Sequence, residues 1–75
     1  MPPTRLTYRQ IADDIAERIR RGEYLSGSAL PSYRALADMY SVSVSTAQAA
    51  VRLLRERGLS RTELGRGVFV ADPDT

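Results

Sequence analysis

Isoleucine recurs at every fourth position early in the chain, at Ile11, Ile15 and Ile19, with charged residues between. Residues four apart share one face of an α-helix, so this spacing predicts an amphipathic helix over residues 8–21. Tyr8 falls on the same stripe and is expected to face inward with the isoleucines.

Two shorter apolar stripes predict two more helices, over residues 33–40 and 44–57. The inward positions are Leu36, Ala37 and Tyr40 in the first and Ala47, Ala50, Val51 and Leu54 in the second. A connection of only three residues separates the two segments. Together they therefore predict a helix-turn-helix.

The residues that flank the three segments support these limits. A side-chain hydroxyl stands one residue before each predicted helix, at Thr7, Ser32 and Ser43, where it can accept a hydrogen bond from a free backbone N–H. Glycine follows the first and third helices, at Gly22 and Gly58, and supplies the left-handed conformation that commonly ends a helix.

The last third of the chain predicts a β-hairpin, or wing. Residues 59–62 and 68–71 are short β-prone runs, joined by residues 63–67 with two glycines. The connection over residues 23–31 contains small residues and a proline, and it is expected to include a short extended piece near residues 29–30.

The predicted fold class is α+β, a winged helix-turn-helix of three helices plus a small β-hairpin wing. A chain of 75 residues buries too little surface to form two cores, so residues 1–71 are expected to be one domain. Residues 72–75 are polar, contain a proline, and are expected to be a tail or the start of a linker.

The composition argues against several classes of function. The chain contains no cysteine and no histidine, and all eleven of its basic residues are arginine. The usual zinc ligands and the common bases for nucleophilic catalysis are therefore missing, so neither an enzyme, a metal nor a cofactor is expected. With no long apolar run and no signal-peptide layout, the expected location is the cytoplasm, with no membrane contact.

The placement of charge favours an anionic partner. The net charge is only +2, but residues 41–71 hold five arginines against two carboxylates. Such an excess is typical of a surface that faces nucleic acid. A solvated helix face has the same charge pattern, so charge alone leaves both interpretations open.

Several motifs occur in the order found in one family of bacterial transcription regulators. They are YRQIA at residues 8–12, GEYLSG at 22–27, LPSYRALA at 30–37, GL at 58–59 and GRGVFV at 65–70. Over about residues 7–71 the chain resembles the N-terminal domain of GntR-type regulators. The resemblance implies sequence-specific binding of double-stranded DNA, with residues 44–57 in the major groove and the wing at 63–67 at the minor groove.

The resemblance also implies roles for polar residues on the two later helices. Ser32 would cap its helix and offer a backbone N–H to DNA, and Arg34 would touch a phosphate. Ser43, Ser45 and Thr46 match the polar positions at the start of the recognition helix. Helix capping and ordinary surface exposure are the simpler roles for these hydroxyls.

At the wing, Arg66 stands between Gly65 and Gly67 and matches the residue that approaches the minor groove in the family. Flanking glycines let the backbone come close to the duplex, and arginine suits the negative potential of a narrow minor groove. A flexible hairpin turn would use the same glycines. Arg52, farther along the third helix, is expected either to contact DNA or to be a solvated charge.

Two positions depart from the family. Val44 and Gln48 stand where members often carry arginine. Val44 cannot donate a hydrogen bond but suits contact with a thymine methyl, whereas Gln48 suits bidentate pairing with adenine. The usual operator preference of the family is therefore not carried over to this chain.

One small module makes few contacts, so a homodimer on a palindromic operator is expected, formed on the DNA or through a C-terminal domain that this chain lacks. An excised domain is expected rather than a minimal regulator, and repression is the expected outcome. The alternative is a protein-interaction module on the same fold, which predicts no salt-sensitive binding to duplex DNA.

Overall fold

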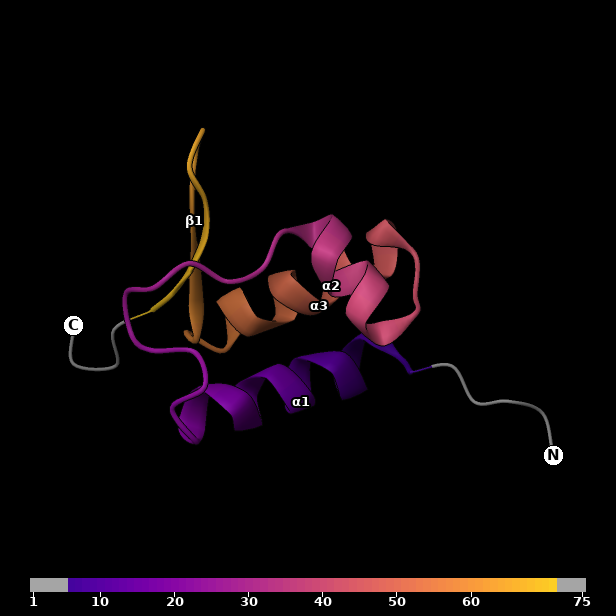
Figure 1. The fold of residues 1–75 in the computed structure, drawn as a ribbon, viewed down its shortest axis with the longest axis horizontal. Coiled ribbons are helices and arrows are strands. Elements are labelled where there is room, and N and C mark those ends of the chain that lie inside the picture. Colours follow the sequence, from indigo (N-terminus) through magenta and orange to yellow (C-terminus); the bar gives the residue numbers. More distant parts are fainter. Residues whose placement is uncertain (1–5, 72–75) are drawn as a thin grey trace, which may run out of the picture.

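The computed structural model describes residues 6–71 and confirms the predicted winged helix-turn-helix. Figure 1 shows three helices packed together, with an antiparallel two-stranded wing that projects away from them. The elements are α1 (Tyr8–Arg20), α2 (Tyr33–Tyr40), α3 (Val44–Glu56), β1 (Ser60–Glu63) and β2 (Gly67–Val70). The expected tail at residues 72–75 lies outside the described residues.

The three predicted residues cap the N-terminal ends of the helices. Thr7 and Gln10 form a reciprocal capping box, with bonds of 3.2 Å from the Gln10 N–H to the Thr7 hydroxyl and 2.9 Å from the Thr7 N–H to the Gln10 side chain. Ser32 and Ser43 each accept a hydrogen bond at 3.1 Å from the backbone N–H three residues on. Each cap satisfies a backbone donor that the helix itself cannot pair.

α1 and α3 each end one residue earlier than predicted, because Arg21 and Arg57 are their C-terminal caps. The glycines that follow, Gly22 and Gly58, have φ angles of 87° and 79° and thus take the expected left-handed conformation. Ser41 takes the same conformation, with φ of 55°, at the end of α2. None of the helices within residues 6–71 is long and apolar enough to cross a membrane.

Both strands of the wing are displaced from their predicted limits by one residue. Leu59 does not begin β1, because its N–H completes the end of α3 by bonding to the Leu54 carbonyl at 2.8 Å. At the tip, the Arg66 N–H bonds to the Glu63 carbonyl at 3.0 Å. This bond shortens the predicted loop of 63–67 to three residues, since Glu63 already pairs with Gly67.

The segment before α2 adds a third, short extended piece to the wing, as the sequence predicted. Ala29 forms an isolated antiparallel bridge with Phe69. The Leu30 N–H bonds to the Val68 carbonyl at 2.8 Å, and the Val70 N–H bonds to the carbonyl of residue 28 at 2.9 Å. Figure 1 shows this segment crossing the base of the wing on its way to α2. The wing is therefore anchored to α2 as well as to α3.

The core lies where the helices meet the base of the wing. Its largest fully buried side chains are Ile11, Ile15, Leu36, Leu54 and Val70. The prediction that Tyr8 faces inward with the isoleucines of α1 is wrong, because Tyr8 is 40% exposed. Tyr8 occupies the first position of α1 and reaches only the open rim between α1 and α3, beside Ala49 and Leu53.

Candidate nucleic-acid interface

The first turn of α3 presents an organised set of hydroxyl and amide groups. The hydroxyl of Ser43 caps the helix and lies 3.0 Å from the hydroxyl of Thr46, so these two side chains are bonded to each other. Ser45 is exposed, and Val44 is 40% exposed. The amides of Val44 and Ser45 belong to the first turn, where a helix supplies no acceptor. They belong to the positive end of the helix dipole.

Farther along α3, polar side chains form one continuous stripe. Ser45, Gln48, Arg52 and Arg55 are three or four residues apart, so they share a helix face, and all four are exposed. Gln48, Arg52 and Arg55 line a single open cavity of about 260 Å³, together with Val51 and Tyr33 of α2. We call Ser45, Gln48, Arg52 and Arg55 the α3 stripe.

Tyr33 lies between the α3 stripe and the wing. Besides the cavity on α3, it borders a second cavity of about 240 Å³. The second cavity is lined by Ser32 from the start of α2 and by Arg66 and Gly67 from the wing. The fold therefore brings Ser32 to the same concavity as Arg66 and Gly67 of the wing, and Tyr33 connects this concavity to the one lined by Gln48 and Arg52 of α3.

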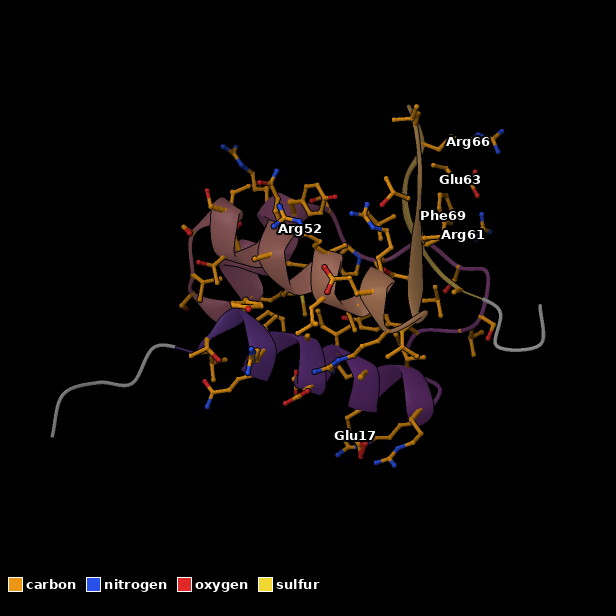
Figure 2. All side chains as sticks on the ribbon, turned by 180° about the vertical axis from the view of Figure 1, so that it is seen from behind. Glu17, Arg52, Arg61, Glu63, Arg66 and Phe69 are labelled. Atoms are coloured by element: carbon orange, nitrogen blue, oxygen red, sulfur yellow. The ribbon has the colours of Figure 1, made fainter. Side chains whose placement is uncertain are left out.

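The wing carries a cluster of charge on its outer side. Arg66 is exposed at the tip, 3.7 Å from one carboxylate oxygen of Glu63. Arg61 pairs with the other oxygen of Glu63, and its guanidinium lies 5.4 Å from the centre of the Phe69 ring. Figure 2 shows these four side chains on the side of the wing that faces away from the helices, with Arg66 at its far end. Leu64, at the tip, is 97% exposed.

Ion pairing divides the arginines of residues 6–71 into two groups. Those paired with a carboxylate are Arg18, Arg20, Arg21, Arg57, Arg61 and Arg66. Arg34, Arg52 and Arg55 pair with none of the described carboxylates, and the same holds for Arg9. Arg34 does not pair with Asp38, the carboxylate four residues farther along α2. Uncompensated charge thus concentrates on α2 and α3.

Opposite faces of the molecule differ in how far their arginines are paired with carboxylates. On α1, Glu17 holds both Arg20 and Arg21, so charges there are largely compensated within the helix. Figure 2 shows Glu17 on the far side of the molecule from Arg52, which lies on the side of α3 toward which the wing projects. A face with unpaired guanidinium groups attracts anions over a longer range than one with matched pairs.

The predicted site residues fall into three neighbouring groups. Ser43, Val44, Ser45 and Thr46 form the first turn of α3, at the end of the helix remote from the wing. Gln48 and Arg52 lie together in the middle of α3, and Ser32 lies with Arg66 and Gly67 across the second cavity. Arg34 is exposed beside Tyr33, and Gly65 lies at the wing tip with φ of 77°.

The sequence did not identify Tyr33 and Arg55 as part of this surface. Tyr33 lies within the LPSYRALA motif but was given no role there, and Arg55 matches no motif. Its position three residues after Arg52 and seven after Gln48 is the one signal that could have placed it on the same helix face.

Comparison with known proteins agrees with this geometry. Residues 7–70 match the family described as bacterial regulatory proteins, gntR family. The chain is 43% identical over 65 residues to the mannosyl-D-glycerate transport/metabolism system repressor MngR of Escherichia coli K12, and 40% identical over 68 residues to the Exu regulon transcriptional regulator of that strain. These matches cover 87% and 91% of this chain but only 27% and 26% of those relatives, so the chain spans about a quarter of their length.

A solved structure gives the same answer for the fold. The DNA-binding domain of AraR in complex with operator ORX1 superposes with a TM-score of 0.82 and 31% identity, over 95% of this chain and 82% of that chain. The match therefore includes the wing as well as the three helices. The chain belongs to the gntR family of bacterial regulatory proteins, as a winged helix-turn-helix domain of that family.

Proposed function

We propose that this chain binds double-stranded DNA in a sequence-specific way, as the DNA-binding domain of a transcription regulator. One observation carries the proposal: Arg34, Arg52 and Arg55 lack carboxylate partners within residues 6–71 and belong to the two helices of the helix-turn-helix. The AraR domain of the same fold forms a complex with operator DNA. Unpaired arginines on this face supply the phosphate contacts that dominate DNA affinity.

In this proposal α3 enters the major groove with its first turns against the bases. Gln48 pairs with adenine, and Val44 contacts a thymine methyl, because neither side chain carries a charge that would favour phosphate over bases. Ser45 is exposed beside them. Ser43 and Thr46, whose hydroxyls are bonded to each other, act on the backbone through the first turn of α3.

Phosphate contacts then fix the position of the domain on the duplex. Arg34 and the amide end of α2, which Ser32 caps, face one phosphate, and Arg52 faces another. The wing reaches the adjacent minor groove, where Arg66 inserts between the backbones. Gly65 and Gly67 support this approach because glycine has no side chain to stand between the wing and the DNA, and because it readily takes the positive φ angles of 77° and 120° found there.

At the level of the whole regulator, we propose that residues 1–71 act as one unit in a homodimer on a palindromic operator, in the cytoplasm. Two copies are needed because one small module buries too little surface for operator affinity. MngR, the relative at 43% identity, is a repressor, and repression by occupying an operator is the outcome we propose here. A C-terminal domain outside this chain would supply further dimer contacts.

Selection of bound duplexes from a random pool tests the proposal. The purified chain should enrich one half-site sequence, and its affinity for that duplex should fall linearly with log salt, with a slope set by the number of phosphates contacted. No enriched sequence together with a flat salt response would reject DNA binding. That result would favour a protein-interaction module on the same fold.

A further inference from the structure

The cavity beside α3 has the composition of an anion site. Its volume is about 260 Å³, and its lining consists of Tyr33, Gln48, Val51, Arg52 and Arg55, of which only Val51 is aliphatic. The second cavity, by contrast, is lined largely by Ala29, Leu30, Pro31 and Val68 with few polar groups. Guanidinium groups and a phenol are suitable donors for phosphate oxygens.

The charges in this cavity are uncompensated. Arg52 and Arg55 stand three residues apart on one helix and share the cavity, and neither pairs with a carboxylate of residues 6–71. Like charges at this helical spacing repel each other, so an anion between them is stabilising. Arg57, only two residues farther on, behaves differently because it bonds to Asp13 of α1 at 2.8 Å.

The location of the cavity suggests which anion it binds. In any duplex that holds α3 in its major groove and the wing in the adjacent minor groove, one sugar-phosphate backbone must pass between them. Tyr33 lies at that place, because it borders both the cavity of the α3 stripe and the cavity that contains Arg66. Its ring is half-buried and packs against the core, so its position is fixed.

We propose that Arg55 and Tyr33, with Arg52, bind a phosphate of the backbone strand that separates the two grooves. This inference rests on the proposed function, and it adds two contact residues, Arg55 and Tyr33, to which the family resemblance assigned no role. Arg55 and Arg52 pair electrostatically with the phosphate, whereas the Tyr33 hydroxyl donates a neutral hydrogen bond to it. The site positions the domain and reads no bases.

Salt titration of the selected duplex tests this site. Arg55→Ala should lower affinity about tenfold and reduce the slope of log affinity against log salt by about one, because one phosphate contact is lost. Arg55→Lys should keep the slope. Arg57→Ala is the matched control: it removes the same charge from the same helix end, but from a residue already paired with Asp13, and should leave the slope unchanged. Tyr33→Phe should weaken binding without changing the slope.

Replacing single phosphates with uncharged methylphosphonates locates the contact. One position between the two grooves should weaken binding of the unaltered protein but cause no further loss in Arg55→Ala. Equal losses at every position, an unchanged salt slope in Arg55→Ala, or a lowered melting temperature as the sole effect would each overturn the inference. Failure of the unaltered protein to bind any duplex would instead reject the proposed function.

Discussion

The phenolic hydroxyl of Tyr40 donates a 2.6 Å hydrogen bond to Oδ2 of Asp14, which joins the last residue of α2 to the middle of α1. The same oxygen accepts a 2.9 Å bond from Nε of Arg18, and Arg18 also bonds to Glu23 at 3.0 Å. The Tyr40 hydroxyl, followed by Arg18, lowers the pKa of Asp14, and burial raises the pKa of Tyr40. This network holds the helix-turn-helix against α1.

The first prediction concerns this bond and pH. Because the pKa of Asp14 lies below its ordinary value of 3.8 in the folded protein, the ionised carboxylate stabilises the fold above that pH. The contribution is lost as the pH falls through the lowered pKa. We expect Tyr40→Phe to reduce the free energy of unfolding by about 1 kcal/mol at neutral pH and by less near pH 2.

Urea unfolding at the two pH values measures this difference. Tyr8→Phe is the control, because Tyr8 lies at the exposed start of α1 and should give no pH-dependent change. A loss in Tyr40→Phe that is equal at both pH values would mean that packing of the ring, rather than the bond to Asp14, determines stability.

The second prediction compares one substitution at two leucines. Leu54 is fully buried between the helices, whereas Leu64 is 97% exposed at the wing tip. Leu54→Ala should lower the free energy of unfolding by about 2–5 kcal/mol, because it removes apolar contacts and leaves a cavity. Leu64→Ala should change it by less than about 0.5 kcal/mol. Thermal melts followed by circular dichroism measure both, and similar melting temperatures would contradict the assigned core.

The third prediction concerns the carboxylate of the wing. Glu63 pairs with both Arg61 and Arg66, so part of the positive charge of the wing is cancelled in the free protein. Glu63→Gln removes this cancellation. We expect tighter binding to random duplex by several-fold and a salt slope steeper by up to about one.

Glu17→Gln is the matched control for Glu63→Gln. Glu17 also holds two arginines, but on α1, on the far side of the molecule from Arg52 (Figure 2). It should leave binding to random duplex nearly unchanged, because that face is not expected to meet DNA. Equal gains from the two substitutions would indicate a general effect of net charge and no local role for the wing.

The fourth prediction separates base contacts from phosphate contacts. Arg34→Ala should weaken binding to all duplexes alike, because a phosphate carries no sequence information. Gln48→Ala should instead change the sequence preference at one position, by about 1–3 kcal/mol against the original base. Repeating the selection from a random pool with each variant measures both effects. The reverse pattern would exchange the two assigned roles.

The helices were predictable because their signals are local. Each cap needs only residues within one turn, as Ser32 and Ser43 show by bonding to the amides three residues on. The strand limits were not, because only the folded chain shows that the Leu59 N–H bonds to the Leu54 carbonyl at the end of α3 and so does not begin β1. Local pattern thus set the type of each element and the starts of the helices, whereas hydrogen bonds formed in the folded chain set the limits of the strands.

The parts of the site that the sequence missed depend on contacts between distant segments. Arg55 becomes part of a cavity only because α2 brings Tyr33 against α3. The bond between Asp14 and Tyr40 likewise joins residues 26 positions apart. No periodicity within one helix encodes such pairs. Motifs named the residues at the first turn of α3 and at the wing tip, because the conformation of each depends on a single local turn.

The backbone hydrogen bonds between residues 27–30 and β2 connect the wing directly to the segment that leads into α2. Leu30, bonded to Val68, lies two residues before Ser32, the N-terminal cap of α2, and three before Tyr33, its first residue. The wing cannot bend on its own to fit a minor groove that is too wide or too shallow. The start of α2 would have to move with it. If the wing and α2 meet DNA as proposed, this fixed spacing would penalise DNA of the wrong local shape even where its bases are correct.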